Sequence, residues 1–388
     1  MYKRQARNGG YAKQINLSAI TLDRVDSCHV HHNDIDSTGY CGISADGNDH
    51  IVERNFIQNA MLLNNDGAAI KSEGVLTFRN TFRNNFVKGC DGNTEGTHNA
   101  SFLTPGIYFD DDVSNSVIQN NTIWNHMERG ILQNPGTQDN EVRGNVVFGG
   151  SSLLELNGGE AQPSTISGIN VKGNTFFALD PSTYLVRQID YSAQYQAGDI
   201  DSNYCIQPYS SNYAIRLDSA FTTSMNFADW QTTGNDVHST PPFFAWTAPQ
   251  NDARLFMNMT DVAAQISLQD TFYLDLDSNL ICGSVLLEPY TSRVLINTGD
   301  ECTISNGATA NSVLLRAFPN PAQDHLFIQV DAKTVGELYT LINLQGQVLR
   351  TGKLNRKLTE LNLDGLSKGM YFLRITAREG ATVPVVIH

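Results

Sequence analysis

The chain has 388 residues, of which 40% are hydrophobic and only 17% are charged, so it can bury a sizeable core under a polar surface. Its formal net charge is −14, and an acidic surface repels phosphate backbones, so we expect no nucleic-acid partner. No apolar run reaches the roughly 18 residues of a membrane-spanning helix, and we therefore expect no membrane span.

The first residues are basic but lack the apolar segment of a signal peptide. We interpret residues 1–19 as the edge of a fragment with an artefactual start. We therefore expect that the signal for export is missing because the chain is truncated at its N-terminus.

The sequence repeats imperfectly over residues 20–180. An asparagine two residues before an apolar residue recurs at intervals of 22, 25, 41, 24 and 29, at Asn33, Asn55, Asn80, Asn121, Asn145 and Asn174. A glycine precedes four of these by 13 or 15 residues, at Gly42, Gly67, Gly106 and Gly130. Such periods indicate a solenoid, and Ile, Val, Phe and Thr without a helical stripe indicate β-strands.

We therefore predict a parallel β-helix in which the glycines lie at the corners and the asparagines stack into a ladder. The longest interval contains residues 88–105, which we predict to form a loop inserted on one coil beside a binding face.

Several motifs resemble the right-handed β-helix proteins of the pectate-lyase-like superfamily. They are AsnAspGlyAlaAlaIle at 65–70, GlyIleTyrPheAspAspAsp at 106–112, and the segments 116–123, 228–234, 236–239 and 241–244. The resemblance implies a right-handed parallel β-helix over residues 20–250. It implies no single chemistry, because the superfamily includes lyases, glycoside hydrolases, epimerases and non-enzymes.

Alternating segments at 273–279 and 287–296 predict a small β-sandwich over residues 251–305. We expect this module to cap the open end of the solenoid. Cys282 and Cys302 lie 20 residues apart here. They form a disulfide if the protein is exported and are isolated buried thiols otherwise.

The C-terminal segments 318–326, 344–349 and 366–375 resemble the sorting domain of the type IX secretion system of Bacteroidota, although the terminal lysine often present is missing. Short strands separated by turn residues agree with an Ig-like β-sandwich over residues 314–388, after a linker at 306–313. The resemblance implies a secreted or surface-anchored all-β protein whose partner is the type IX secretion machinery. An ordinary adhesive β-sandwich is the alternative, and we expect a monomer.

Equivalent side chains on stacked coils lie about 4.8 Å apart. Counting four residues from each corner glycine gives a column of Asp46, Lys71, Asp110 and Asn134. Counting six gives Asn48, Glu73, Asp112 and Gly136. If Ile43, Ile107 and Ile131 face inward, alternation directs Tyr108 and Asp110 outward.

Glycoside hydrolysis needs two carboxylates, about 5–5.5 Å apart for retention or about 6.5–9.5 Å apart for inversion, and stacked coils offer both separations. Crowding raises the pKa of one carboxyl group, as an acid catalyst requires. We predict a glycoside hydrolase acting on a polysaccharide, with catalytic residues Asp110, Asp111, Asp66 and Glu128. The predicted substrate-binding residues are Tyr108, Lys71, His98 and Glu73.

Three alternatives stay open at this point. The acidic run is compatible with a solvated turn or with Ca²⁺ held by Asp112 and Asp46. A Ca²⁺-dependent polysaccharide lyase needs a base, for which the candidates are Lys71, His98, Tyr108 and Arg129, but the absence of a tight Lys/Arg cluster favours hydrolysis. The third alternative is a non-catalytic adhesion or glycan-binding protein. We interpret His29, His31 and His32 as surface residues because a third metal ligand is missing.

Overall fold

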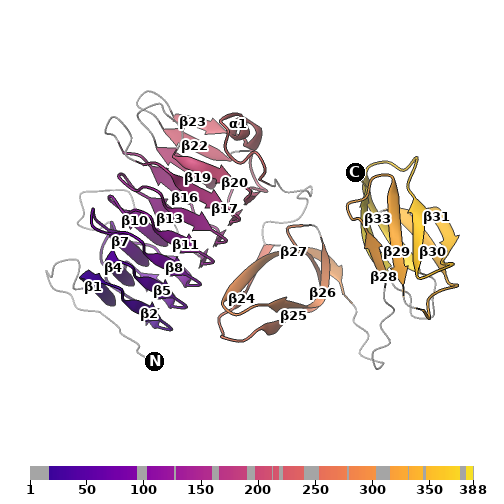
Figure 1. Ribbon diagram of the computed structural model, residues 1–388, viewed down its shortest axis with the longest axis horizontal. Helices are drawn as coiled ribbons and strands as arrows, with labels where there is room; N and C mark the ends of the chain where they lie inside the picture. The colour runs from indigo at the N-terminus through magenta and orange to yellow at the C-terminus, as the bar shows by residue number, and fades with distance from the viewer. Residues whose placement is uncertain are drawn as a thin grey trace. The chain divides into compact units, whose positions relative to one another are not determined.

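The structure is a computed structural model (Figure 1), and it describes the residues in the following ranges: 17–93, 103–125, 128–159, 166–189, 197–211, 213–217, 222–239, 253–277, 279–302, 315–330, 332–343, 347–375 and 382–387. The chain divides into two compact units, Met1–Glu301 and Cys302–His388. The first unit contains a solenoid and an additional antiparallel sheet. No helix in the described ranges is long and apolar enough to cross a membrane.

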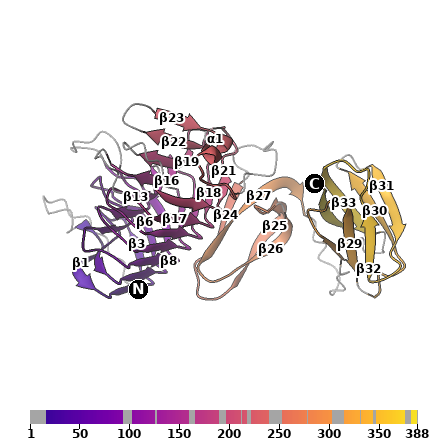
Figure 2. The ribbon, with the colours of Figure 1, turned by 45° about the horizontal axis from the view of Figure 1, so that its top comes forward.

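The solenoid is a stack of coils in which successive strands enter three sheets in turn (Figures 1 and 2). Sheet A consists of β1 (Ile20–Asp26), β4 (Ile43–Asn48), β7 (Ile70–Glu73), β10 (Ile107–Asp110), β13 (Arg129–Gln133), β16 (Ser152–Asn157), β19 (Tyr184–Ile189), β22 (Ala214–Leu217) and β23 (Thr222–Met225). Sheet B consists of β2 (His29–His31), β5 (Ile51–Glu53), β8 (Thr81–Arg83), β11 (Val117–Gln119), β14 (Glu141–Arg143), β17 (Ile169–Lys172) and β20 (Gly198–Asp201). Sheet C consists of β3 (Asp34–Asp36), β6 (Phe56–Ala60), β9 (Phe86–Cys90), β12 (Thr122–Trp124), β15 (Val146–Phe148), β18 (Thr175–Phe177) and β21 (Tyr204–Ile206).

The strands of these sheets pair in parallel, apart from the final pair β22 and β23. Ile43, Ile107 and Ile131 are fully buried in the interior, as predicted. This confirms the predicted parallel β-helix, whose core is filled by the alternate side chains that point inward.

A ladder of asparagines runs through the stack at the turn between sheets B and C. The Nδ2 of Asn85 donates to Oδ1 of Asn121 at 2.9 Å, and Asn121 donates likewise to Asn145 at 3.0 Å. The members are Asn33, Asn55, Asn85, Asn121, Asn145, Asn174 and Asn203. The ladder confirms the prediction, because each amide satisfies a buried backbone and side-chain group of the next coil.

The assignment of Asn80 to this ladder was wrong. Asn80 lies at the turn between sheets A and B, where its Oδ1 accepts from the backbone N–H of His50 at 2.8 Å. Its own N–H donates to Ser116 at 3.0 Å. Each coil therefore contributes to two polar ladders, one at the turn between sheets A and B and the other at the turn between sheets B and C. The sequence spacing alone did not distinguish the two.

The corner glycines are required by close packing. A Cβ at Gly106 would lie 2.6 Å from the side chain of Ile123, and one at Gly130 would lie 2.4 Å from Val147. Gly106 directly precedes the first residue of β10, whereas Gly67 lies three residues before the start of β7.

The two extra residues after Gly67 shift the register, so the predicted columns were wrong in this coil. Lys71 pairs with Tyr108, and Glu73 pairs with Asp110. Asp112 is consequently not the partner of Glu73.

The C-terminal end of the solenoid is closed by helix α1 (Phe227–Thr232) and the residues after it. Trp230 is fully buried in the core. The carboxylate of Asp236 accepts hydrogen bonds from Trp230 Nε1 and the Tyr213 hydroxyl, both at 2.8 Å, and from Asn203, the last asparagine of the ladder. The segments 228–234 and 236–239 therefore close the stack, whereas 241–244 lies outside the described residues.

The segment predicted as a small β-sandwich consists of one four-stranded antiparallel sheet in the order β24, β27, β25, β26. Its strands are β24 (Ala253–Asn258), β25 (Ala264–Leu274), β26 (Leu280–Leu287) and β27 (Thr291–Glu301). Val294 and Ile296 pack against Phe148, Phe177 and Ile206 of sheet C. The expectation that this module caps the end of the solenoid was wrong, because its apolar face packs against the side of the coils.

Of the two alternatives for Cys282 and Cys302, the structure has the disulfide that we expect for an exported protein. Cys282 and Cys302 are disulfide-bonded. The remaining four of the six cysteines are free, so Cys282 and Cys302 are each other's partners.

The second unit consists of two antiparallel sheets. One contains β28 (Leu315–Phe318), β29 (His325–Val330) and β32 (Leu358–Asn362); the other contains β31 (Val348–Lys353), β30 (Leu338–Asn343), β33 (Gly369–Ile375) and β34 (Thr382–Ile387). Side chains of both sheets, including Ile328 and Leu373, share one fully buried cluster. The predicted Ig-like sandwich is confirmed, while residues 306–313 and 344–346 lie outside the described ranges.

Candidate active site

Charged residues gather on the outward face of sheet A. Phe109 points into the core, so its neighbours Tyr108 and Asp110 point outward, as predicted. The register aligns one outward column across consecutive strands, which contains Ser44, Lys71, Tyr108, Leu132, Glu155 and Arg187. A second column, two residues further along the strands, contains Glu73 and Asp110.

Lys71 joins two carboxylates of the second column. Its Nζ lies 2.8 Å from Oε2 of Glu73 and 2.8 Å from Oδ2 of Asp110. The two oxygens are therefore at most twice this distance apart. The Lys71 side chain is only 5% exposed. Burial is the largest single influence and acts to lower the pKa of Lys71, but Asp110, Tyr40 and Glu73 together outweigh burial and raise the pKa, so the ammonium group stays charged.

Asp110 is held on both of its oxygens. Oδ2 pairs with Lys71, while Oδ1 accepts from Nδ2 of Asn134 at 2.5 Å and from the backbone N–H of Asp111 at 3.0 Å. Its side chain is 9% exposed. Burial and the neighbouring Asp110 both raise the pKa of Tyr108. Asp110 is thus a fixed, nearly enclosed carboxylate that orients Lys71.

Asp111 is exposed and adjacent to this group. Its carbonyl oxygen accepts from the N–H of Gly74 at 2.8 Å, which places Asp111 beside Glu73 on the neighbouring strand. Burial, followed by the charges of Asp110 and Glu73, raises the pKa of the Asp111 carboxyl group. Glu73 is half exposed, with 50% of its side chain in contact with solvent.

Two further carboxyl groups with raised pKa adjoin Lys71 and Glu73. Burial raises the pKa of Asp66, and it raises the pKa of Asp46 to about 6. The side chain of Asp46 accepts from the N–H of Glu73 at 2.9 Å. A group of carboxyl groups with different proton affinities is the feature from which an acid and a base can be assigned.

Glu128 belongs to a different cluster on the same sheet. It lies 3.0 Å from Arg129 Nη1, and Arg129 Nε is 2.5 Å from Glu155. Glu155 also accepts from Arg187 at 2.9 Å. Glu128 therefore lies in a cluster with Arg129, and burial raises the pKa of the Glu128 carboxyl group. Glu128 was predicted to be catalytic together with Asp110 and Asp111, but among the described residues it makes no hydrogen bond or ion pair with either of them.

The predicted metal ligands are not brought together. Across the described ranges, no group of three or more His, Cys, Asp or Glu side chains is arranged to hold a metal ion. Asp112 adopts a φ of 64°, and its carboxylate lies against Gly136. On sheet B, His29 contacts Glu53 at 2.9 Å, while His31 contacts His32 at 2.7 Å. His98 lies outside the described residues.

The sequence reasoning missed Glu155 and Arg187. Both lie on the outward face and alternate with buried residues: Glu155 lies between Leu154 and Leu156, and Arg187 lies between Val186 and Gln188. That alternation is visible in the sequence, but no corner glycine of the repeat precedes either strand. The strands could therefore not be aligned with the earlier coils.

Two family models match the chain. One, described as a right handed beta helix region, matches residues 18–215, which is about half of the chain. The other, described as a secretion system C-terminal sorting domain, matches residues 316–388. No curated protein matches the sequence. The sorting domain indicates that the protein is exported by type IX secretion, is attached at the cell surface or secreted, and interacts with the type IX machinery.

Proposed function

Because this chain belongs to the right-handed β-helix family and ends in a type IX sorting domain, we propose that it is an exported glycoside hydrolase that cleaves a polysaccharide on the outward face of sheet A. The observation that carries the proposal is the Lys71 bridge between Glu73 and Asp110, with Asp111 of raised pKa beside it.

The different environments of the carboxyl groups suggest their roles. Asp111 is exposed and has a raised pKa, so it is protonated over a wider pH range and donates a proton to the glycosidic oxygen. Glu73 is half exposed and its orientation is fixed by Lys71, so it serves as the second carboxylate, either activating water or attacking the sugar. Asp110 and Asn134 act as positioning residues through Lys71.

Asp66 remains the second choice for the acid. Burial raises its pKa, and it interacts electrostatically with both Lys71 and Asp110. Tyr108 forms part of the floor of the site, since its ring lies 5.2 Å from the Lys71 ammonium group and is almost fully buried.

The lyase alternative requires a base that is deprotonated near neutral pH. The pKa values of Lys71 and Tyr108 are both raised, so both hold their protons more firmly than the free side chains. Arg129 is engaged by Glu128 and Glu155. These contacts favour hydrolysis over proton abstraction.

The roles are tested with the variants Glu73→Gln and Asp111→Asn, measuring reducing ends released from a panel of polysaccharides. We expect each variant to lose roughly 10²–10⁴-fold in rate. Asp139→Asn is the matched control, because Asp139 is an exposed carboxylate on the turn before β14. Unchanged rates in both site variants would exclude the catalytic assignment and favour a glycan-binding protein.

A further inference from the structure

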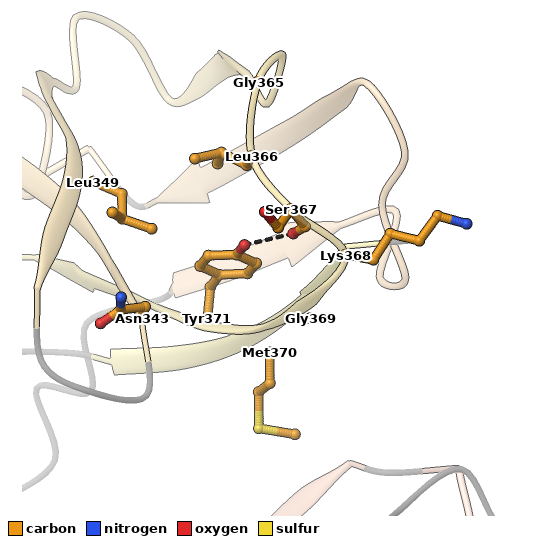
Figure 3. Close-up of a pocket in the computed structure, with 9 residues that line it drawn as sticks. All are labelled: Asn343, Leu349, Gly365, Leu366, Ser367, Lys368, Gly369, Met370 and Tyr371. Carbon is orange, nitrogen blue, oxygen red and sulfur yellow. Dashed lines mark hydrogen bonds between the residues drawn. The ribbon is translucent and has the colours of Figure 1, made fainter.

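The sorting domain contains a pocket of about 390 Å³ beside the start of β31. Leu349 and Leu366 lie around the ring of Tyr371, with Asn343 at the rim (Figure 3). The Tyr371 hydroxyl donates to the carbonyl oxygen of Ser367, which fixes the ring (Figure 3). The pocket thus has an apolar floor large enough to receive a side chain, and Lys368 extends outward from its edge.

The strand β31 that borders this pocket has a free edge. Among the described strands of the second unit, it has a neighbour, β30, on one side only. The opposite edge strand, β34, is covered: Ala322 donates to the carbonyl of Val386, and Asn320 accepts from the N–H of Val386 and donates to the carbonyl of Pro384. A free edge presents unpaired backbone groups that can bind another strand.

The strand β31 and the segment that follows it are strongly basic: Arg350 and Lys353 lie on β31, while Arg356 and Lys357 lie in the connection to β32. Residues 350–357 contain four cations and no carboxylate, namely Arg350, Lys353, Arg356 and Lys357. Residues 302–388 contain nine Lys and Arg against six Asp and Glu, which gives a net charge of +3. Because the whole chain has a net charge of −14, residues 1–301 have a net charge of −17. Positive charge on an edge strand opposes pairing with a second copy of that strand and favours an acidic partner.

We propose that β31 is the docking edge of the sorting domain, and that it binds an extended acidic segment of a type IX secretion protein by strand addition. The backbone of the segment pairs with β31, an apolar side chain enters the pocket over Tyr371, and acidic side chains meet Lys353 and Arg356. Val348, which is 57% exposed at the start of β31, is covered by the bound segment.

Charge reversal tests this proposal in the full chain, which is fused behind a cleavable N-terminal signal peptide and expressed by a host with type IX secretion. Lys353→Glu with Arg356→Glu changes the net charge by four, and so does the control pair Lys333→Glu with Arg374→Glu, whose residues are exposed elsewhere in the same domain. We expect the first pair to lower the surface fraction at least tenfold and the control to leave it near the native value. Equal secretion of the two variants would overturn the proposal.

If Lys353→Glu with Arg356→Glu lowers the unfolding temperature, a loss of secretion could reflect misfolding, and a second measurement then tests the docking edge directly. A photoreactive phenylalanine replaces Val348 in one chain and Phe318, which is 42% exposed on β28, in the control. We expect cross-linking from position 348 to an acidic segment of a secretion-system protein. Cross-linking to a second copy or to lipopolysaccharide, or no yield above the control, would overturn the proposal.

Discussion

Two columns of polar side chains run through the stacked coils: the asparagine ladder and the charged residues on the outward face of sheet A. They differ in how their side chains interact with one another. In the ladder that contains Asn85, Asn121 and Asn145, each neutral amide both donates and accepts, so every coil satisfies the next. On the outward face of sheet A, Lys71 is shared by Glu73 and Asp110, and the neighbouring Asp111 has a raised pKa. The first column stabilises the stack, while the second places a carboxyl group of raised pKa beside a buried ion pair, which is typical of a catalytic site.

Removing the central cation of the charged column gives the largest expected effect. Lys71→Met leaves Asp110 buried without its cation, and loss of one partner of a buried pair costs about 3–5 kcal/mol. We expect a lower urea midpoint together with loss of hydrolysis. The double variant that adds Asp110→Asn should recover part of the stability, and no recovery would show that Lys71 does not act through Asp110.

Removing one amide of the ladder should affect stability alone. Asn121→Ala takes the acceptor from Asn85 and the donor from Asn145, and each unsatisfied buried group costs about 1–3 kcal/mol. We expect a total loss of about 3 kcal/mol in urea unfolding with kcat unchanged. A variant that remained stable but lost activity would remove the distinction between the two columns.

The pH dependence of stability should report on Asp46. Its pKa is about 6 in the folded protein against an ordinary value of 3.8, so the folded state binds more protons between these values. The contribution of Asp46 to stability therefore falls as pH rises from 3.8 to 6 and is constant above that range, with a total change of about 2 kcal/mol after allowance for partial exposure. Unfolding of Asp46→Asn should show a shallower slope, because Asp66 and Asp111 still have raised pKa values, whereas an identical profile in both chains would mean that Asp46 does not contribute to it.

The smallest effect is expected at an exposed ion pair on the turn between sheets A and B. Arg79 and Asp49 lie 2.7 Å apart but are 54% and 41% exposed, so solvent screens their attraction. We expect no measurable change in stability or hydrolysis for Arg79→Ala. A loss comparable to that of Lys71→Met would show that burial does not set the strength of these pairs.

The repeat could be predicted from sequence because each coil obeys the same steric rule. Glycine lies directly before β10 and within the first two residues of β13, where the corner meets Ile123 and Val147, and asparagine recurs where the turn must satisfy the hydrogen-bonding groups of the next coil. The alignment failed at Gly67, since two additional residues before β7 leave the glycine in place but move the strand. Counting from a single anchor cannot detect such an insertion.

The packing of the four-stranded sheet against the solenoid could not be predicted from the sequence pattern. The strands over residues 253–301 were recognised, but the choice between the end and the side of the solenoid depends on apolar residues outside the core, such as Phe148 and Phe177 on sheet C. The cluster of Glu155 with Arg129 and Arg187 likewise required the register of strands from three coils. Asp110 and Asp111, in contrast, were found because they lie together in the motif at 106–112.

The most direct test of the proposed hydrolysis is product analysis with the native chain on neutral and uronic polysaccharides, with and without Ca²⁺. New reducing ends and ultraviolet absorbance from unsaturated products are recorded together. The proposed roles of Glu73 and Asp111 predict reducing ends without absorbance, independent of Ca²⁺. Absorbance that requires Ca²⁺, or no product from any polysaccharide, would contradict them.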